Sequence, residues 1–393
     1  MAGCVLLLAT GVAFCFWKYL LSRNDDSSEA ISEKPQYIWI EACRPVSIRQ
    51  PLEVVNIGDN GEKGLYCVLG GSVATDDDGG DASYRFFIPT EGRYRLWGYC
   101  RWLDAEGDGF VVDIGGDSTI VRKSKTSSPW QWLPLAERLL PAGVERFTLK
   151  TKGGGFAVRR MFLSNDITTH PRRCDVRPID YFFDDFDGCE EGEFDSWNRV
   201  SGQWTVHRRE DSRSPAAKLL IGKSSSEALI GVGASAWHDY SLTLDCRTLH
   251  ASPGAMAAIR FCRDPEGNGL VLRWNPTDKN GQTQLELLHE DIAAVRVLGR
   301  FSVGWDTSVW SELSVTIRGG AIAVSIDSLP ICTIPYHGPS KGAIGLWLSG
   351  DVEMMFDNVQ VIGWRDRTLS PTTKTNHQER DDKEDFAHDE EKQ

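Results

Sequence analysis

Carboxylates in this sequence could do acid–base chemistry, and their spacing decides between catalysis and a passive role. Hydrolysis of a glycosidic bond needs two carboxylates about 5–10 Å apart, one on each side of the bond. Glu191, Glu193 and Asp195 alternate, but Gly192 and the acidic residues around them are typical of an exposed loop. The run 286–291 is typical of a strand end and a turn. We therefore expect no catalytic residues.

Four aspartates could instead hold a structural calcium ion. Asp184, Asp185 and Asp187 lie at the start of the second half of the chain, and Asp357 lies near its end. Carboxylate oxygens from two strand ends suit Ca²⁺, and they would meet here if the first and last strands of this half pair. The alternative is that these aspartates are solvated side chains at strand ends.

Tryptophan side chains offer a third kind of chemistry, the binding of sugar rings. The apolar face of a pyranose can lie on an exposed indole while nearby Asn, Asp or Arg side chains bond its hydroxyls. We expect ligand contacts from two groups: Trp102, Trp130 and Trp132 in predicted loops, and Arg273, Trp274 and Asn275. The alternative for each tryptophan is a place in a β-sandwich core.

The elements that position these residues are predicted to be strands. Short runs such as 84–88 and 93–100 are bounded by Gly, Pro and Asp clusters at intervals of about 8–12 residues. Apolar and polar residues alternate in the run 311–317, and a Gly-Gly turn then leads into the run 321–326, which predicts a hairpin. The predicted fold class is all-β, with two β-sandwich (jelly-roll) domains after an N-terminal transmembrane helix.

Changes in composition divide the 393 residues into six segments. We expect a transmembrane anchor or signal at 2–21, a linker at 22–36, a β-sandwich at 37–166, a linker at 167–180, a jelly roll at 181–364 and a disordered charged tail at 365–393.

Segment 2–21 contains one charged residue, Lys18. About twenty helical residues span about 30 Å, the thickness of a bilayer hydrocarbon core, so we expect a retained single-pass anchor. A signal peptide cleaved near the run 11–13 is the alternative. Lys18 and Arg23 follow the span, and the positive-inside rule alone would place the rest of the chain in the cytoplasm.

The net charge bears on which partners the protein can bind, and the cysteine content bears on the redox compartment in which it folds. The formal net charge of −13 argues against sequence-independent binding of nucleic acid, which needs clustered Lys and Arg. Of the ten cysteines, two lie in segment 2–21, and the other eight would permit disulfides in an oxidising compartment. Several of them lie within apolar strand patterns, as Cys67 does, and we favour buried free thiols there.

Two resemblances add to this interpretation. The first half resembles the carbohydrate-binding modules of families 6 and 35 in the runs 40–42, 87–97, 130–132 and 140–143. In those modules an early Glu and a late Asp hold calcium; Glu41 matches, but the run 158–160 has no Asp. The second half resembles the concanavalin- or laminin-G-like domain of the 3-keto-disaccharide hydrolase type. Its matching runs are 183–186, 201–204, 237–242, 342–347 and 355–359.

With the anchor expected at 2–21, these resemblances imply a membrane-anchored protein whose domains are extracytoplasmic and recognise glycan or a cell-envelope polymer. One alternative is a structural subunit that binds proteins in a membrane-associated assembly. The other alternative is a glycoside hydrolase of the 3-keto-disaccharide type.

Overall fold

The computed structural model describes residues 35–50, 52–57, 65–70, 80–103, 109–122, 130–151, 155–174, 176–187, 189, 196–209, 218–277 and 282–366. The predicted anchor at 2–21, nearly all of the linker at 22–36 and nearly all of the tail at 365–393 lie outside these residues. Within the described ranges, no helix has the length and apolar content needed to span a bilayer. The residues from Gln36 onward belong to one compact unit.

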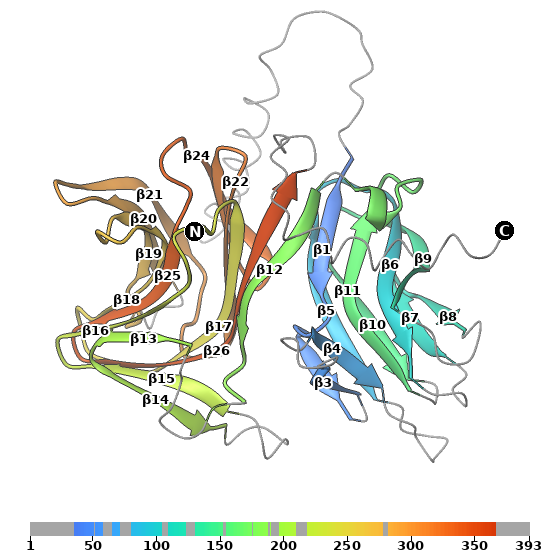
Figure 1. Cartoon of the computed structure of the whole chain (residues 1–393), viewed down its shortest axis with the longest axis horizontal. Coiled ribbons are helices and arrows are strands. Elements are labelled where there is room, and N and C mark those ends of the chain that lie inside the picture. The colour runs from blue at the N-terminus through green and yellow to red at the C-terminus, as the bar shows by residue number, and fades with distance from the viewer. Residues whose placement is uncertain are drawn as a thin grey trace, which may run out of the picture. The chain divides into compact units, whose positions relative to one another are not determined.

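The first half of this unit is a β-sandwich of two antiparallel sheets (Figure 1). Sheet A has the order β3 (Leu52–Ile57), β4 (Leu65–Gly70), β11 (Phe156–Ser164), β6 (Gly92–Trp102) and β9 (Gln131–Leu140), and β1 (Tyr37–Glu41) also pairs with β11. Sheet B has the order β2 (Ser47–Arg49), β5 (Asp81–Ile88), β10 (Gly143–Thr151), β7 (Phe110–Ile114) and β8 (Asp117–Val121).

The second half is also a sandwich of two antiparallel sheets. Sheet C has the order β14 (Gln203–Arg208), β15 (Lys218–Ser224), β26 (Val352–Asp366), β17 (Tyr240–Ala251), β22 (Ser311–Arg318), β23 (Ala321–Ile326) and β24 (Leu329–Pro335), and β12 (Val176–Asp184) also pairs with β26. Sheet D has the order β13 (Asn198–Ser201), β16 (Glu227–Val232), β25 (Ala343–Ser349), β18 (Met256–Arg263), β19 (Gly269–Trp274), β20 (Thr283–Glu290) and β21 (Val295–Val303). A short 3-10 helix, η1 (Pro171–Arg173), lies between the sandwiches in sequence.

Alternation of apolar and polar residues explains these strands. Every second residue of β6 and of β22 is buried, as a strand with one face on a core requires. The predicted hairpin is confirmed: β22 pairs with β23, and Gly319 and Gly320 have φ angles of 58° and 76° in the turn. Such left-handed angles favour glycine because it has no Cβ. The predicted all-β fold class is confirmed for the described residues.

The first and last strands of the second sandwich lie side by side. β12 pairs antiparallel with β26, so that Asp184 lies opposite Val359, and the pairing on which the predicted calcium site depends is present. Trp204, Trp274, Tyr240 and Phe356 are among the fully buried side chains of this sandwich. The first sandwich has its own apolar core, which includes Tyr84, Phe110, Phe147 and Phe156.

Buried cysteines occur in both sandwiches. Cys43, Cys100, Cys246 and Cys262 are buried free thiols. Burial raises the pKa of each of them, that of Cys262 to about 12, so they stay protonated and unreactive. Cys67 lies in β4, where the structure describes only the backbone.

Candidate functional site

Two of the predicted sugar-binding tryptophans are core residues. Trp274 is fully buried and Trp102 is 3% exposed. Trp274 ends β19 on the same side as Leu270 and Leu272, and Trp102 ends β6 on the same side as Cys100. The expectation that these two rings contact a ligand is therefore corrected: side chains at alternate positions point to the same face, and here that face is the core.

Arg273 points the opposite way from Trp274 and reaches the outer face of sheet D. Cross-strand pairing places six outward residues in one row across the sheet, which contains, in order, Leu229, Trp347, Ala258, Arg273, Glu286 and Arg300. Arg273 is the one residue of this row that the sequence analysis predicted as a ligand contact. It was chosen because it is adjacent to Trp274.

Trp347 is the half-buried aromatic side chain of this row. Its ring packs against a small apolar cluster of Ala258, Val271 and Leu288 on the outer side of the sheet. Its indole N–H donates a hydrogen bond of 2.8 Å to Oε1 of Glu227. The ring is therefore held in place by packing on one side and by a hydrogen bond at its edge, while part of its surface remains exposed.

Paired charges lie beside Trp347 and farther along the row. The guanidinium of Arg260 lies 5.9 Å from the Trp347 ring centroid and donates to Glu290 at 2.7 Å. Glu286 accepts from Arg273 and from Arg300, each at 2.6 Å. The hydrogen bond from Arg300, followed by that from Arg273, lowers the pKa of Glu286 despite its partial burial, so Glu286 is ionised at neutral pH.

Two glycines lie on strands next to this ring. Gly231 of β16 pairs with Gly345 of β25, and Gly345 pairs with Arg260 of β18. Gly345 is buried, with side-chain atoms of Leu229 and Arg260 close to it. We call the surface formed by Trp347, Arg260, Arg273, Arg300, Glu286, Glu290 and Glu227 the Trp347 face.

Sequence reasoning missed most of the Trp347 face, although β25 carried a signal. Ile344, Leu346 and Leu348 alternate with Trp347 and are buried, so the tryptophan had the parity of an outward residue. No pattern in the sequence indicated that Glu227 or Arg260 lies next to Trp347, because both residues come from other strands.

The other predicted ligand residues lie elsewhere. Asn275 follows β19, and its side-chain oxygen accepts hydrogen bonds from the Thr277 backbone N–H and hydroxyl. Trp132 lies in β9 of sheet A and not in a loop as predicted, and Trp130 directly precedes this strand. Both rings are half-buried, and the Tyr99 ring centroid lies 5.4 Å from that of Trp130 and 5.2 Å from that of Trp132. Ligand contact by Trp130, Trp132, Arg273 and Asn275 stays a prediction.

The four predicted calcium ligands all have partners within the protein. Asp184 accepts from the Phe186 backbone N–H and the Trp197 indole, Asp185 accepts from the Asp187 backbone N–H, and Asp187 accepts from the Lys218 backbone N–H. Asp357 pairs with Arg209 at 2.9 Å. In the ranges that the structure describes, no three His, Cys, Asp or Glu side chains are grouped as a metal site requires. Calcium binding stays a prediction.

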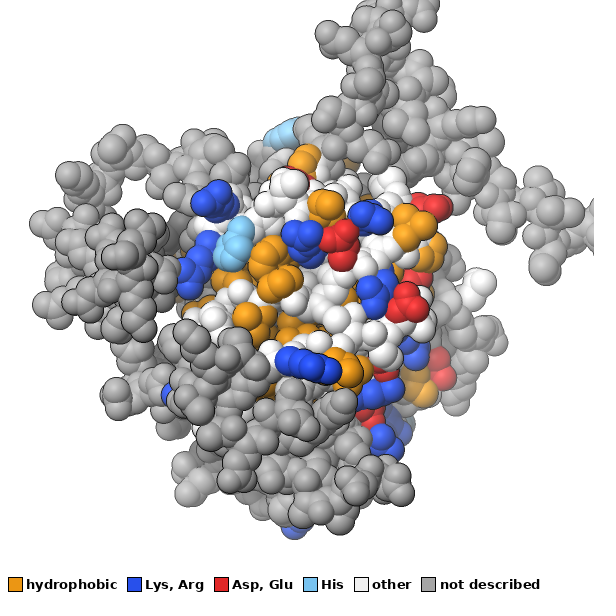
Figure 2. Space-filling view, turned by 90° about the vertical axis from the view of Figure 1, so that its right-hand side faces the viewer, with side chains coloured by type: hydrophobic (Ala, Val, Ile, Leu, Met, Phe, Trp, Pro, Cys, Tyr) orange, Lys and Arg blue, Asp and Glu red, His pale blue; other side chains and the backbone are white. Residues whose placement is uncertain are grey.

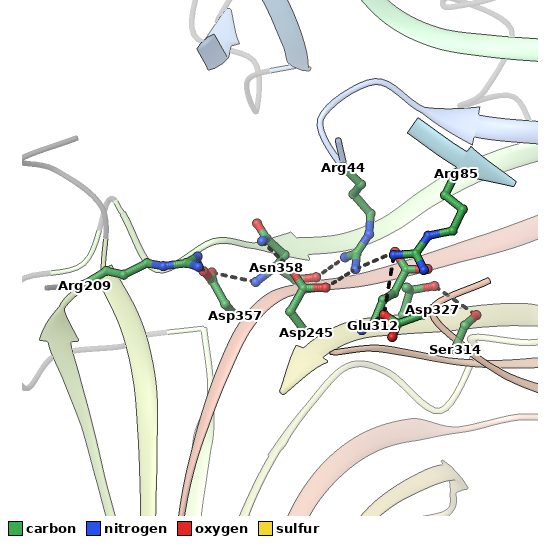
Figure 3. A network of polar contacts seen from close by, with 10 residues as sticks. Arg44, Arg85, Arg209, Asp245, Glu312, Ser314, Asp327, Asp357 and Asn358 are labelled. Carbon is green, nitrogen blue, oxygen red and sulfur yellow. Dashed lines mark hydrogen bonds and ion pairs between the residues drawn. The ribbon is translucent and has the colours of Figure 1, made fainter. Parts of the chain in front are cut away.

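A polar network connects the two sandwiches (Figure 3). Arg44, in the loop after β1, donates to Asp245 of β17 at 3.0 Å, to Glu312 of β22 at 3.3 Å and to the backbone oxygen of Asn358 of β26. The Arg44 side chain is 8% exposed. A buried arginine therefore joins the first sandwich to three strands of sheet C.

A cavity of about 650 Å³ lies in the same sandwich as the Trp347 face. It lies beside the edge strands β21 and β24, and its lining is mostly apolar, with Phe301, Trp305, Val309, Leu329 and Ile331. It contains none of the residues of the Trp347 face, and its few polar groups do not surround an exposed ring. The cavity is therefore the weaker candidate for binding a polar ligand.

No family model matches this chain, and no curated protein matches it. Among solved structures, a carbohydrate-binding module, CBM66, from Bacillus subtilis is similar over 42% of this chain and 94% of its own length, with 17% identity and a TM-score of 0.34. A galectin-like protein of unknown function from Bacillus subtilis covers 44% and 90%, with 15% identity and a TM-score of 0.34. A family 16 glycoside hydrolase from Bacteroides ovatus, in complex with a product, covers 46% and 99%, with 12% identity and a TM-score of 0.36. Likenesses at these scores carry no argument about function.

Proposed function

We propose that the protein binds a neutral carbohydrate through the Trp347 face. The observation that carries the proposal is a partly exposed indole, held in place by packing and by Glu227, on a sheet face that also carries paired Arg and Glu side chains. A sugar ring presents an apolar face to such an indole and hydroxyls to the surrounding Arg and Glu groups.

The charge balance of the face supports a neutral ligand. Arg260 is paired with Glu290, and Glu286 is shared by Arg273 and Arg300. With Glu227 at the indole, three arginines face three glutamates. An acidic sugar would have to compete with these carboxylates, whereas hydroxyls can accept from the arginines and donate to the glutamates.

The pairing of the carboxylates favours binding over hydrolysis. A glycosidase needs one carboxylic acid with a raised pKa to protonate the leaving oxygen. The pKa of Glu286 is lowered instead, and Glu290 is engaged by Arg260. Hydrolysis of the 3-keto-disaccharide type stays an alternative. Turnover of a disaccharide or its 3-keto form by the wild type, with loss of this turnover in Glu286→Gln, would support it.

The setting that we propose is a membrane anchor at 2–21 that holds the two sandwiches on the outer side of the membrane, next to glycan or an envelope polymer. The single charge in this segment supports the anchor. Recovery of the full chain in the membrane fraction after an alkaline wash is expected. Release of the full chain into the supernatant would contradict the anchor.

The test of the binding proposal is a glycan array probed with the full chain and with Trp347→Ala. We expect the variant to lose at least about tenfold in affinity for the glycans that the wild type binds, which corresponds to about 1.4 kcal/mol. Trp347→Phe keeps an aromatic platform and should retain most of the binding. Leu249→Ala is the control, because Leu249 is 46% exposed and is not part of the face.

Two outcomes would contradict this proposal. In the first, folded Trp347→Ala binds the same glycans as the wild type with equal affinity. In the second, the wild type binds no glycan and co-purifies with a protein at fixed stoichiometry, which would favour the alternative of a structural subunit.

A further inference from the structure

The cavity of about 650 Å³ lies where the second sandwich ends at one edge. β21 is the last strand of sheet D and β24 is the last strand of sheet C, so within the described ranges no further strand closes the sandwich on this side. Residues of both strands line the cavity, together with the loop that follows β21. Its volume is within the range of about 300–1,000 Å³ that is usual for sites that bind small molecules.

The wall of the cavity is mostly apolar. β21 contributes Phe301 and Val303, β24 contributes Leu329 and Ile331, and the loop after β21 contributes Trp305. Trp305 is 3% exposed and Leu329 is 54% exposed, so the apolar lining continues from the core of the sandwich to its surface. Burial of such a lining by a ligand is favourable because it removes apolar surface from water.

The charged residues that line the cavity are both acidic. They are Asp306 and Asp327, and the lining contains no Lys, Arg or His. Oδ1 of Asp327 accepts a hydrogen bond from the Glu312 backbone N–H and lies 3.9 Å from Nη2 of Arg85. This distance is longer than a hydrogen bond, so Arg85 compensates the charge of Asp327 only in part.

Asp306 has no cationic partner among the residues that the structure describes. Its side chain is exposed, and Oδ1 accepts hydrogen bonds from the hydroxyl and the backbone N–H of Ser308, at 2.6 Å and 2.9 Å. These bonds, with that of the hydroxyl first, lower the pKa of Asp306, so the carboxylate is ionised at neutral pH. An apolar cavity therefore carries an uncompensated negative charge in its lining.

The two edge strands are poorly suited to pair with a strand of another protein. β24 contains Pro330 and Pro335, which have no N–H to donate. β21 has a bulge where it pairs with Leu287 and Leu288 of β20. Prolines and bulges at the edge of a sheet hinder its extension by a further strand. These features favour a small molecule over an extended peptide as the occupant of the cavity.

Exposed hydrophobic side chains also occur on the first sandwich, but in a different setting. On the side of the molecule shown in Figure 2 they lie among Lys, Arg, Asp and Glu side chains, so charges of both signs are close to them. The charged residues of the cavity lining have one sign only, and this sign selects the charge of the ligand.

We propose that the cavity binds a hydrophobic amine, with its apolar body against the wall and its positively charged nitrogen near Asp306 and Asp327. A neutral molecule of the same shape would make the apolar contacts alone, and a carboxylate would be repelled by both aspartates. The proposal does not rest on carbohydrate binding, because no residue of the Trp347 face lines the cavity.

The experiment is isothermal titration calorimetry of the purified full chain with three probes that share one apolar body. The probes are para-phenylbenzylamine, para-phenylbenzyl alcohol and para-phenylbenzoate, and the blank is buffer with any lipid carrier but without protein. We expect the amine to bind at least about fivefold more tightly than the alcohol, as a solvent-exposed ion pair of about 1 kcal/mol does. The carboxylate should bind most weakly, and added salt should weaken binding of the amine.

Two variants test the carboxylate and the mouth of the cavity. Asp306→Asn keeps the oxygen that accepts from Ser308 and removes the charge, so it should weaken binding of the amine about fivefold and leave that of the alcohol unchanged. Leu329→Lys places a positive charge at the cavity and should also weaken binding of the amine. Leu249→Lys is the matched control, because Leu249 is 46% exposed and does not line the cavity.

Trp347→Ala should leave binding of the amine unchanged, so failure of this proposal and failure of the carbohydrate proposal can be told apart. The inference is overturned if the folded wild type does not bind the amine, or if it binds the carboxylate as tightly. It is also overturned if Asp306→Asn binds the amine as the wild type does, or if Leu329→Lys and Leu249→Lys bind it equally.

Discussion

Replacement of Arg44 by alanine tests whether the network in Figure 3 holds the two sandwiches together. Arg44 donates to Asp245, Glu312 and the backbone oxygen of Asn358. Removal of one partner of a buried ion pair costs about 3–5 kcal/mol, because the remaining charges lose their compensation. Asp245 and Glu312 are 29% and 32% exposed, so water can solvate them in part. The expected loss is therefore about 2–3 kcal/mol.

Urea denaturation is the assay, followed by tryptophan fluorescence and by circular dichroism. Because Arg44 joins two sandwiches with separate cores, removal of its side chain weakens the contact between them more than either core. We expect a lower urea midpoint for Arg44→Ala and a separation of the transition into two steps, which the two probes would report differently. Arg44→Met should recover only the part of the loss that comes from packing.

The matched control is Arg49→Ala in the same sandwich. Arg49 pairs with Asp81 at 2.7 Å, but its side chain is 59% exposed against 8% for Arg44. Exposed ion pairs contribute about 0–1 kcal/mol, so this variant should unfold almost as the wild type does. If both variants lose the same stability, or if Arg44→Ala still unfolds in one step at the wild-type midpoint, the reasoning fails.

Two further predictions concern the aspartates at the start of the second sandwich. Burial, followed by the nearby Asp187 charge, raises the pKa of Asp185 from its usual value of 3.8 to about 6. The folded state therefore binds more protons than the unfolded state between these two pH values, and stability falls as pH rises from about 4 to about 6. The unfolding free energy of Asp185→Asn should depend less on pH across this range. An unchanged dependence would contradict the raised pKa of Asp185. If Asp184, Asp185, Asp187 and Asp357 bind calcium, excess Ca²⁺ should raise the melting temperature of the wild type but not of Asp185→Asn, because a ligand that binds the folded state stabilises it. Equal melting curves of the wild type with Ca²⁺ and with EGTA would show that the calcium prediction is wrong.

Much of the fold could be predicted from the sequence because strand formation depends on local pattern. The alternation in Ser311–Ile317 predicted a half-buried strand, and the two glycines after Arg318 predicted the hairpin with Ala321–Ile326. The same alternation could have placed Trp274 in the core, since Leu270 and Leu272 share its parity. The prediction went wrong there because neighbouring polar residues were given more weight than parity.

What the sequence determined by itself was thus the period of each strand, and with it which residues of one strand share a face. Only the tertiary structure decided which strands became neighbours, and so which side chains meet. Glu227, Arg260 and Trp347 come from three strands separated by up to 120 residues, and Arg44 meets Glu312 over 268 residues. Contacts of this kind depend on long-range pairing and register, which a period-two pattern does not specify.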